Sequence, residues 1–278
     1  MRISHRTPEG NEAYPHEIPQ FGLGVFLMSE GGECKSSVLN ALDAGYTHID
    51  TARVYANESE VGQAIKESGV NRDSVFITTK LRRGHATGYE DTLEHCKKSL
   101  ELLDMEYIDL YLVHAPPEDP EHRMPVWKAM EHCLEQGWVK AIGVSNYGAA
   151  HLEAMKDYAS YMPCVNQVEF NPWLQRPQLK QAIEDAGAKV MAYSPLARGH
   201  KVDDPQLAEI AQRLGCTPAQ VAIKFCYDQG CITIPKSSNP ERIIENLASL
   251  EVDISEEMDA ILALEENYVS GWDPTTEP

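Results

Sequence analysis

Short apolar runs alternate along the chain with longer segments in which apolar residues recur at helical spacing. The apolar runs occupy residues 21–26, 47–50, 74–79, 108–113, 139–145, 164–169, 189–194 and 231–235. Between the third and fourth runs, for example, Leu93, Cys96, Leu100 and Leu103 would share one face of a helix. Strands that are apolar throughout, each followed by a helix, are typical of a parallel sheet covered by helices.

The number of these units favours one closed fold. Eight strand–helix units in about 250 residues match a (β/α)8 TIM barrel better than an open doubly wound sheet. The stretch "FGLGVF" has two glycines but lacks the third glycine of the dinucleotide-binding fingerprint, which disfavours a Rossmann domain. We therefore expect a single (β/α)8 barrel domain over residues 1–278. Residues 1–17 would cap the N-terminal end of the barrel, and residues 266–278 would form a C-terminal tail near a barrel mouth.

The composition is that of a soluble globular protein, with 42% hydrophobic and 24% charged residues. No apolar stretch approaches the roughly 20 residues that a membrane helix needs. The first seventeen residues lack the apolar core of a signal peptide. The 7 cysteines include no C-x-x-C pair, which favours reduced thiols over a structural zinc site. We therefore expect a cytoplasmic protein without a membrane partner.

The formal net charge of −19 restricts the possible partners further. Nucleic acids and anionic membranes bind basic surfaces, so neither is expected as a partner. An anionic ligand would have to be held by a local group of basic side chains that acts against the field of the whole protein.

Polar side chains stand at the carboxyl ends of three consecutive predicted strands. Asp50, Lys80 and His114 end the second, third and fourth strands, and Tyr55 lies five residues beyond Asp50. A barrel of this kind has its active site at this end of the strands, so the four side chains should converge. A nearby ammonium should lower the pKa of the tyrosine from its usual value near 10. With a carboxylate holding the lysine and an imidazole orienting a carbonyl oxygen, the cluster predicts a proton donor aimed at a carbonyl group.

Each of these residues also has an alternative interpretation. Asp50 and Lys80 could form a structural ion pair, His114 could be a hydrogen-bonded core residue, and Tyr55 could simply pack. Lys80 could form a Schiff base as in barrel aldolases, although that reaction leaves Tyr55 and Asp50 unexplained. No metal site is expected, because the ammonium would oppose a divalent cation.

Seven motifs, taken together and in order, resemble those of the aldo-keto reductases over roughly residues 18–265. They read "HIDTARVYANESEVG", "FITTKL", "DLYLVHAPP", "AIGVSNY", "NQVEFNPW", "AYSPLARG" and "TIPKSSNPERIIEN". Overall the chain is most similar to the bacterial 2,5-diketo-gluconate reductase-like branch of that family.

The resemblance implies a role for each matching residue. Tyr55, as general acid, Asp50, Lys80 and His114 match the catalytic tetrad of the family. The residues that match its nicotinamide site are Ser145, Asn146 and Gln167, which would hold the carboxamide, Tyr193, which would stack on the ring, and the adjacent cofactor contacts Ser194 and Leu196. The residues that match its contacts to the 2′-phosphate and adenine are Lys236, Ser237, Arg242, Glu245 and Asn246. A lysine, a hydroxyl and an arginine after the last barrel strand suit a dianionic phosphate, so NADPH (NADP+) is expected rather than NADH.

Three residues depart from the usual pattern of the family. Phe26, Ala115 and Asn171 stand where relatives often carry tryptophan or tyrosine, tryptophan, and histidine. All three are expected to line an open substrate pocket. The sequence therefore predicts a monomeric enzyme that reduces aldehydes or ketones with NADPH, and small aldehydes, α-dicarbonyls and keto sugars all stay open as substrates. A nicotinamide-binding sensor that keeps the fold without turnover is the alternative of a different class.

Overall fold

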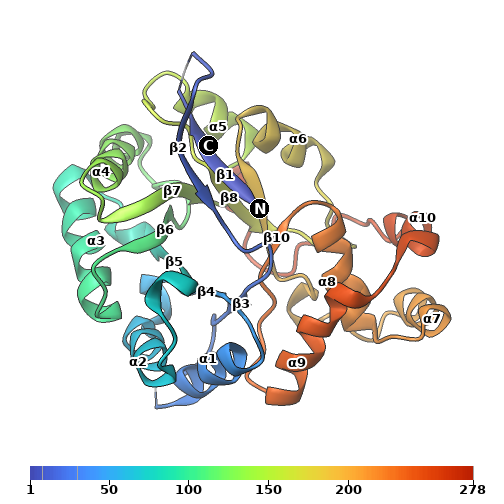
Figure 1. Ribbon diagram of the computed structural model, residues 1–278. Helices are drawn as coiled ribbons and strands as arrows, with labels where there is room; N and C mark the ends of the chain where they lie inside the picture. Colours follow the sequence, from blue (N-terminus) through green and yellow to red (C-terminus); the bar gives the residue numbers. More distant parts are fainter. Residues whose placement is uncertain (8, 30, 278) are drawn as a thin grey trace.

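The computed structural model describes residues 1–7, 9–29 and 31–277. Its central sheet has eight parallel strands that pair in the order in which they occur in the sequence (Figure 1). The strands are β3 (Leu23–Gly24), β4 (His48–Asp50), β5 (Phe76–Leu81), β6 (Ile108–Val113), β7 (Val139–Ser145), β8 (Val165–Glu169), β9 (Lys189–Tyr193) and β10 (Ile232–Thr233).

Backbone hydrogen bonds between the first and last strands of this sheet close the barrel. Phe21 and Thr233 form a parallel bridge. Gly22 donates a hydrogen bond of 3.0 Å to the Thr233 carbonyl, and Thr233 donates one of 2.8 Å to the Gln20 carbonyl. The predicted (β/α)8 barrel is confirmed.

Helices follow the strands and surround the sheet (Figure 1). They are α1 (Glu33–Asp43), α2 (Glu58–Ser68), α3 (Tyr89–Leu103), α4 (Arg123–Glu135), α5 (Ala149–Met155), α6 (Pro177–Asp185), α7 (Pro205–Leu214), α8 (Pro218–Asp228), α9 (Pro240–Ala248) and α10 (Met258–Leu262). Side-chain caps fix where several of them begin. At α8, for example, Thr217 and Gln220 cap each other's backbone N–H groups, the reciprocal arrangement of a capping box.

The third barrel strand begins and ends two residues later than the sequence pattern predicts. The apolar run covers residues 74–79, whereas β5 covers Phe76–Leu81, with all six residues buried. Lys80, expected at the end of the strand, therefore lies within it, one residue before Leu81. Because successive side chains of a strand point to opposite faces, Lys80 shares the inner face with Phe76 and Thr78. This alternation is what carries the ammonium into the interior of the barrel.

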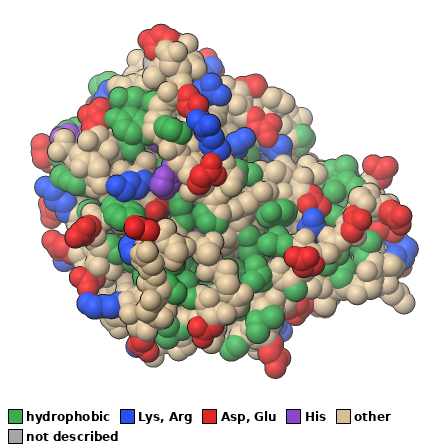
Figure 2. All heavy atoms as spheres, in the orientation of Figure 1, with side chains coloured by type: hydrophobic (Ala, Val, Ile, Leu, Met, Phe, Trp, Pro, Cys, Tyr) green, Lys and Arg blue, Asp and Glu red, His purple; other side chains and the backbone are tan. Residues whose placement is uncertain are grey.

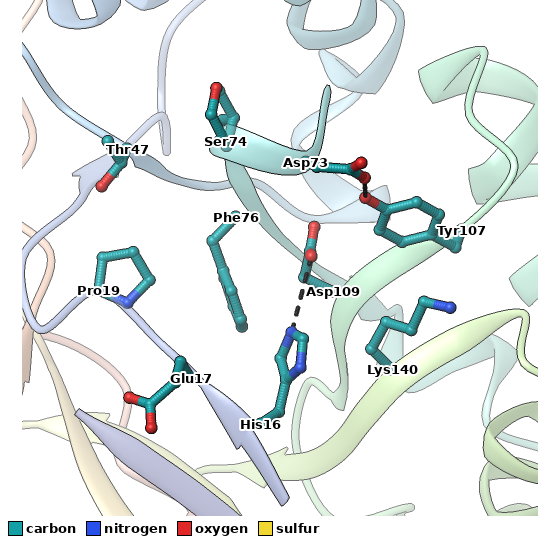
Figure 3. Close-up of a pocket in the computed structure, with 11 residues that line it drawn as sticks. His16, Glu17, Pro19, Thr47, Asp73, Ser74, Phe76, Tyr107, Asp109 and Lys140 are labelled. Carbon is teal, nitrogen blue, oxygen red and sulfur yellow. Dashed lines mark hydrogen bonds and ion pairs between the residues drawn. The ribbon is translucent and has the colours of Figure 1, made fainter. Parts of the chain in front are cut away.

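An antiparallel hairpin of β1 (Arg2–Arg6) and β2 (Glu12–Glu17) precedes the barrel. Ile3 and Ile18 pack with inward-facing barrel residues such as Leu110. A cavity of about 540 Å³ lies between the hairpin and the strands, where His16 Nε2 comes within 3.9 Å of Asp109 Oδ1 (Figure 3). The hairpin thus buries apolar side chains against the N-terminal end of the barrel.

The segment after α10 returns to the opposite end of the barrel, where the strands end. The Ser270 N–H donates to both oxygens of Glu169, at 3.2 Å each, and Arg176 pairs with Asp273 at 2.9 Å. Gly148 makes room for this segment, since a Cβ there would lie 1.9 Å from the Thr275 carbonyl oxygen. The C-terminal segment is therefore held beside the carboxyl ends of the strands.

On the face shown in Figure 2, acidic and basic side chains are interspersed with apolar and neutral surface. Among the described residues, no helix combines the length and apolar character required to span a bilayer.

Candidate active site

A cavity of about 960 Å³ opens at the carboxyl ends of the barrel strands, and we call it the main cavity. Its lining includes residues from the ends of the strands, from the loops that follow them and from α9. Among them are Phe26, Asp50, Tyr55, His114, Ala115, Ser145, Asn146, Gln167, Tyr193, Ser194, Leu196, Lys236, Ser237, Arg242, Glu245 and Asn246. Nearly all the site residues expected from the sequence therefore border one continuous space.

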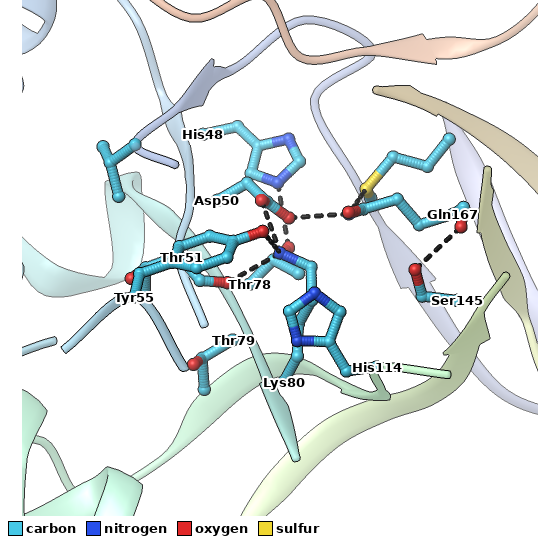
Figure 4. A network of polar contacts seen from close by, with 12 residues as sticks. His48, Asp50, Thr51, Tyr55, Thr78, Thr79, Lys80, His114, Ser145 and Gln167 are labelled. Atoms are coloured by element: carbon cyan, nitrogen blue, oxygen red, sulfur yellow. Dashed lines mark hydrogen bonds and ion pairs between the residues drawn. The ribbon is translucent and has the colours of Figure 1, made fainter. Parts of the chain in front are cut away.

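Lys80 is the centre of a hydrogen-bond network at the bottom of this cavity (Figure 4). Its ammonium donates to Asp50 Oδ1 at 2.6 Å, to the Thr51 carbonyl at 2.7 Å, and to the Tyr55 hydroxyl at 3.4 Å. The lysine side chain is fully buried, so these three acceptors replace the water that an exposed ammonium would have. The network fixes the ammonium next to the phenol oxygen.

Asp50 joins this network to the side of the barrel where β8 lies. Its second oxygen, Oδ2, accepts a hydrogen bond of 2.7 Å from the Gln167 amide. With Lys80 on Oδ1, both oxygens of the buried carboxylate have a donor. The orientation of the Gln167 amide is therefore tied to the same carboxylate that holds the lysine.

Burial and Asp50 raise the pKa of Tyr55 well above its usual value, while Arg198 acts in the opposite direction. The sequence-based expectation of a lowered pKa is therefore wrong in its net direction, because burial and Asp50 outweigh the effect of the ammonium. The physical reason is that a phenolate in this position would lose its hydration and would also be repelled by Asp50. A phenol with a raised pKa stays protonated at neutral pH, which suits a proton donor.

Burial shifts the pKa values of Lys80 and His114 downwards, opposite to its effect on the pKa of Tyr55. Burial lowers the pKa of Lys80, although the adjacent Asp50 carboxylate opposes the shift. Burial and the neighbouring Lys80 lower the pKa of His114 to about 3. The imidazole is therefore neutral at physiological pH, with its ring centroid 5.6 Å from that of Tyr55 in an edge-to-face arrangement. A neutral imidazole can donate a single N–H to an oxygen placed between the two rings.

Four of the residues expected at the nicotinamide lie in one connected group. Ser145 Oγ donates to the Gln167 carbonyl at 2.8 Å and accepts from the Asn146 amide at 3.0 Å. The Tyr193 hydroxyl donates to Asn146 Oδ1 at 2.9 Å, which restrains its ring at the cavity wall. The group thus offers amide and hydroxyl groups beside an aromatic ring.

The loop between β10 and α9 forms the other end of the main cavity. Asn239 caps α9 by accepting a hydrogen bond of 2.9 Å from the Arg242 N–H, and Ser237 Oγ accepts one of 3.2 Å from the Asn239 N–H. Within the described residues, the side chains of Lys236 and Arg242 form neither an ion pair nor a hydrogen bond. Two cations that form no ion pair with a described residue, at the start of a helix and next to a hydroxyl, are suited to a phosphate group.

Two of the three residues expected in the substrate pocket line the main cavity, and one does not. Phe26 lies beside Tyr55 with a centroid distance of 5.0 Å, and Ala115 also lines the main cavity. Asn171 does not line it. This side chain is fully buried, where its Oδ1 accepts from the Trp173 N–H and its amide reaches the Ser194 carbonyl. Its function in the structure is to hold a turn below the cavity.

The main cavity also contains residues that the sequence interpretation did not assign. Val54, Arg198 and Trp272 all line it. Arg198 could have been noticed, because it lies in the "AYSPLARG" motif. Trp272 carries no comparable signal, since its position depends on how the C-terminal segment folds back over the barrel.

The carboxyl ends of the barrel strands bring together a buried lysine–carboxylate pair, a protonated phenol and a neutral imidazole. Such a group of titratable side chains is typical of an enzyme active site. The aldo/keto reductase family matches residues 33–265 of the chain. The chain belongs to the aldo/keto reductase family and is an oxidoreductase.

Individual relatives agree with this assignment. The glyoxal reductase of Bacillus subtilis is 42% identical over 259 residues, which cover 93% of each chain. An aldo-keto reductase from a deep-sea metagenome library is 38% identical, with a TM-score of 0.86 and coverage of 91% of this chain and 93% of that one. A variant of Gox0644 in complex with NADPH is 34% identical, with a TM-score of 0.88 and coverage of 100% and 98%. The narrower resemblance to 2,5-diketo-gluconate reductases stays a prediction.

Proposed function

We propose that the protein reduces aldehydes or ketones to alcohols with NADPH, and that Tyr55 is the general acid. The observation that carries this proposal is the 3.4 Å contact between the Lys80 ammonium and the Tyr55 hydroxyl in a buried network with Asp50. The phenol is kept protonated by its surroundings and faces the main cavity, so it can donate its proton to a carbonyl oxygen.

Each neighbour of Tyr55 then has its own task. The Lys80 ammonium stabilises the negative charge that develops on the phenol oxygen as the proton leaves. Asp50 holds that ammonium in place through the 2.6 Å contact. His114, as a neutral imidazole, donates a hydrogen bond that orients the carbonyl oxygen towards the phenol. In this scheme Lys80 is not a Schiff-base nucleophile, because its three contacts hold it as a buried ammonium.

The main cavity has the chemistry that NADPH requires. Amide and hydroxyl groups of Ser145, Asn146 and Gln167 would bind the carboxamide, and Tyr193 would stack on the nicotinamide ring. When bound, NADPH supplies the hydride that reduces the carbonyl carbon. At the far end, Lys236 and Arg242, which form no ion pair with the residues that the structure describes, would bind the 2′-phosphate.

The remaining residues expected to bind NADPH also line the cavity. Ser237 provides a hydroxyl for the phosphate, and Glu245 and Asn246 on α9 would contact adenine. Glu245 is oriented by the Thr217 hydroxyl, which donates a hydrogen bond of 2.7 Å to its carboxylate. Ser194 and Leu196, in the loop after β9, would cover the middle of the cofactor.

Small aldehydes, α-dicarbonyls and keto sugars are the proposed substrates, and the protein is proposed to act as a cytoplasmic monomer. The glyoxal reductase of Bacillus subtilis supports α-dicarbonyls as one class. The direct test follows NADPH absorbance with methylglyoxal, a nitrobenzaldehyde, glyceraldehyde and a diketo-gluconate, with NADH in parallel. Turnover of several substrates with NADPH is expected. Tight NADPH binding without turnover of any of them would indicate a sensor instead.

A further inference from the structure

A second cavity, at the opposite end of the barrel from the main cavity, is not used by the proposed reaction. It is the cavity of about 540 Å³ between the N-terminal hairpin and the strands, and we call it the hairpin cavity (Figure 3). Its lining comes from the end of β2 and from the amino ends of β5, β6 and β7, and none of its described lining residues also lines the main cavity. Its volume lies in the range of small-molecule sites, roughly 300–1,000 Å³.

One wall of the hairpin cavity is apolar. Val75 and Phe76, both buried, line it together with Pro19. The ring of His16 lies beside Phe76, with 5.7 Å between the two ring centroids. This wall can therefore remove the hydrocarbon part of a small ligand from water.

A buried carboxylate oxygen faces the same cavity without a hydrogen-bond donor. Asp109 is 6% exposed, and its Oδ2 accepts hydrogen bonds from Arg72 Nη2 at 2.5 Å and from the Ile77 N–H at 2.9 Å. Its Oδ1 accepts no hydrogen bond from a described residue. His16 Nε2 lies 3.9 Å from Oδ1, beyond hydrogen-bond distance, and Figure 3 shows the two groups pointing towards each other. A buried acceptor without a donor is unfavourable, so a ligand N–H between these groups would be stabilised.

The charges in the lining favour a cation over an anion. Among the described lining residues, the three carboxylates of Glu17, Asp73 and Asp109 stand against one lysine, Lys140. The net charge of −19 adds to this preference, because the field of the whole protein attracts cations.

Two of the three carboxylates already have partners within the protein. Glu17 lies 3.7 Å from the N-terminal ammonium, and Asp73 Oδ1 accepts a hydrogen bond of 2.6 Å from the Tyr107 hydroxyl. Lys140 extends over the Tyr107 ring, with its ammonium 4.8 Å from the ring centroid. Asp109 Oδ1 is therefore the acceptor in this lining that is best placed to bind a cationic donor.

We propose that the hairpin cavity binds a small primary amine as its ammonium ion. An ammonium has three N–H donors, which is enough to donate both to Asp109 Oδ1 and to Nε2 of a neutral His16. The hydrocarbon part of the amine lies on Phe76 and Val75. The site is independent of the proposed reductase function, because it lies at the end of the barrel away from Tyr55 and the cofactor.

Isothermal titration of the full chain with 2-phenylethylamine, and with 2-phenylethanol as its uncharged counterpart, tests the proposal. We expect the amine to bind at least about tenfold more tightly than the alcohol, as a charged hydrogen bond allows. Asp109→Asn should weaken binding of the amine by a similar factor and change that of the alcohol by less than about twofold. Because Asp109 also holds Arg72 and the Ile77 N–H, His16→Phe provides a second test that leaves this ion pair intact. It should weaken binding of the amine severalfold.

Lys140→Met tests the sign of the charge that the cavity accepts. It removes a positive charge from the lining, so the amine should bind about twofold or more tightly at low salt. Lys97→Met is the matched control. Lys97 is also exposed and lies over an aromatic ring, 4.6 Å from the centroid of Trp138, but it does not line the cavity. This variant should leave the affinity for the amine unchanged.

The absence of saturable amine binding, or equal affinities for amine and alcohol, would overturn the proposal. So would unchanged amine binding in both Asp109→Asn and His16→Phe. Weaker amine binding in Lys140→Met would contradict it as well, because a neighbouring ammonium does not favour a cation. Competition between the amine and NADPH would place the amine in the main cavity instead. None of these measurements uses aldehyde turnover, so the reductase function can fail without any effect on this result.

Discussion

Lys80 Nζ lies 2.6 Å from Asp50 Oδ1, and the exposed fractions of the two side chains are 0% and 3%. Burial of an ion pair is stable only where the remaining donors and acceptors are also satisfied. Here the Thr51 carbonyl accepts from the ammonium, and the Gln167 amide donates to the second carboxylate oxygen. The stability of the barrel and the orientation of the proposed proton donor therefore depend on the same pair.

Breaking this pair should destabilise the protein. Lys80→Met leaves the Asp50 carboxylate buried without its cation, and we expect the free energy of unfolding to fall by about 3–5 kcal/mol. Urea unfolding followed by circular dichroism measures this. The double variant Asp50→Asn/Lys80→Met should lose less than the sum of the two single variants. Additive losses would mean that the pair contributes no coupling energy.

Removing the phenol oxygen should abolish most carbonyl reduction. Tyr55→Phe keeps the ring against Phe26 and His114 but has no proton to donate, so kcat should fall by about 10²- to 10⁴-fold. The Kd for NADPH, measured by fluorescence titration, should stay within about twofold of the wild-type value, because the hydroxyl lies at the bottom of the cavity. Tyr14→Phe, on the distant hairpin, is the matched control. Unchanged turnover in Tyr55→Phe would refute the proposed general acid.

The choice between NADPH and NADH should depend on the loop between β10 and α9. Lys236→Met and Arg242→Met each remove a cation for which the described part of the chain provides no ion-pair partner. Each should raise the Kd for NADPH by roughly tenfold or more and that for NADH by less than twofold, since NADH lacks the 2′-phosphate. Isothermal titration of both cofactors tests this. A wild-type protein that binds the two cofactors equally would contradict the assignment before any variant is made.

Stability should decrease as the pH falls from about 6.5 towards 4. Burial lowers the pKa of His5 and His48 from 6.5 to about 4, so in this range the unfolded chain binds more protons than the folded one. The free energy of unfolding then rises with pH, by at most about 1.4 kcal/mol per pH unit for each such histidine.

Urea unfolding between pH 4.5 and 7 measures this slope, and one buried histidine can be tested separately. His48→Gln removes one titrating group while it keeps an amide that can reach Thr78 Oγ1, the 2.9 Å partner of the imidazole. We expect a shallower dependence of stability on pH in this variant. A slope identical to that of the wild-type protein would show that His48 binds a proton equally well in the folded state.

The barrel could be predicted because the sequence pattern of each strand–helix unit is local and the unit is repeated along the chain. Eight buried strands, each followed by a helix, leave a periodic pattern in the sequence, and the polar residues that end those strands must meet at one end of a closed barrel. Asp50, Tyr55 and His114 were therefore identifiable as neighbours although His114 is more than fifty residues from either of the other two.

The sequence alone did not give the exact limits of β5, and those limits place Lys80 inside the barrel instead of at its rim. It also suggested the wrong sign for the pKa of Tyr55, because the cost of burying a charge depends on everything that surrounds it. Asn171 was expected in the substrate pocket from its position in a motif, and that position does not say which way the side chain points.

Patterns in the sequence thus determined the (β/α)8 barrel, the group of titratable side chains and the pair of cations after the last strand. Tertiary structure decided how deeply each side chain is buried, which donors remain without partners, and that the C-terminal segment brings Trp272 and Gly271 back to the cavity. Strand and helix patterns arise from neighbouring residues, whereas burial and pairing arise from contacts between segments far apart in the chain. Only the folded chain brings those segments together.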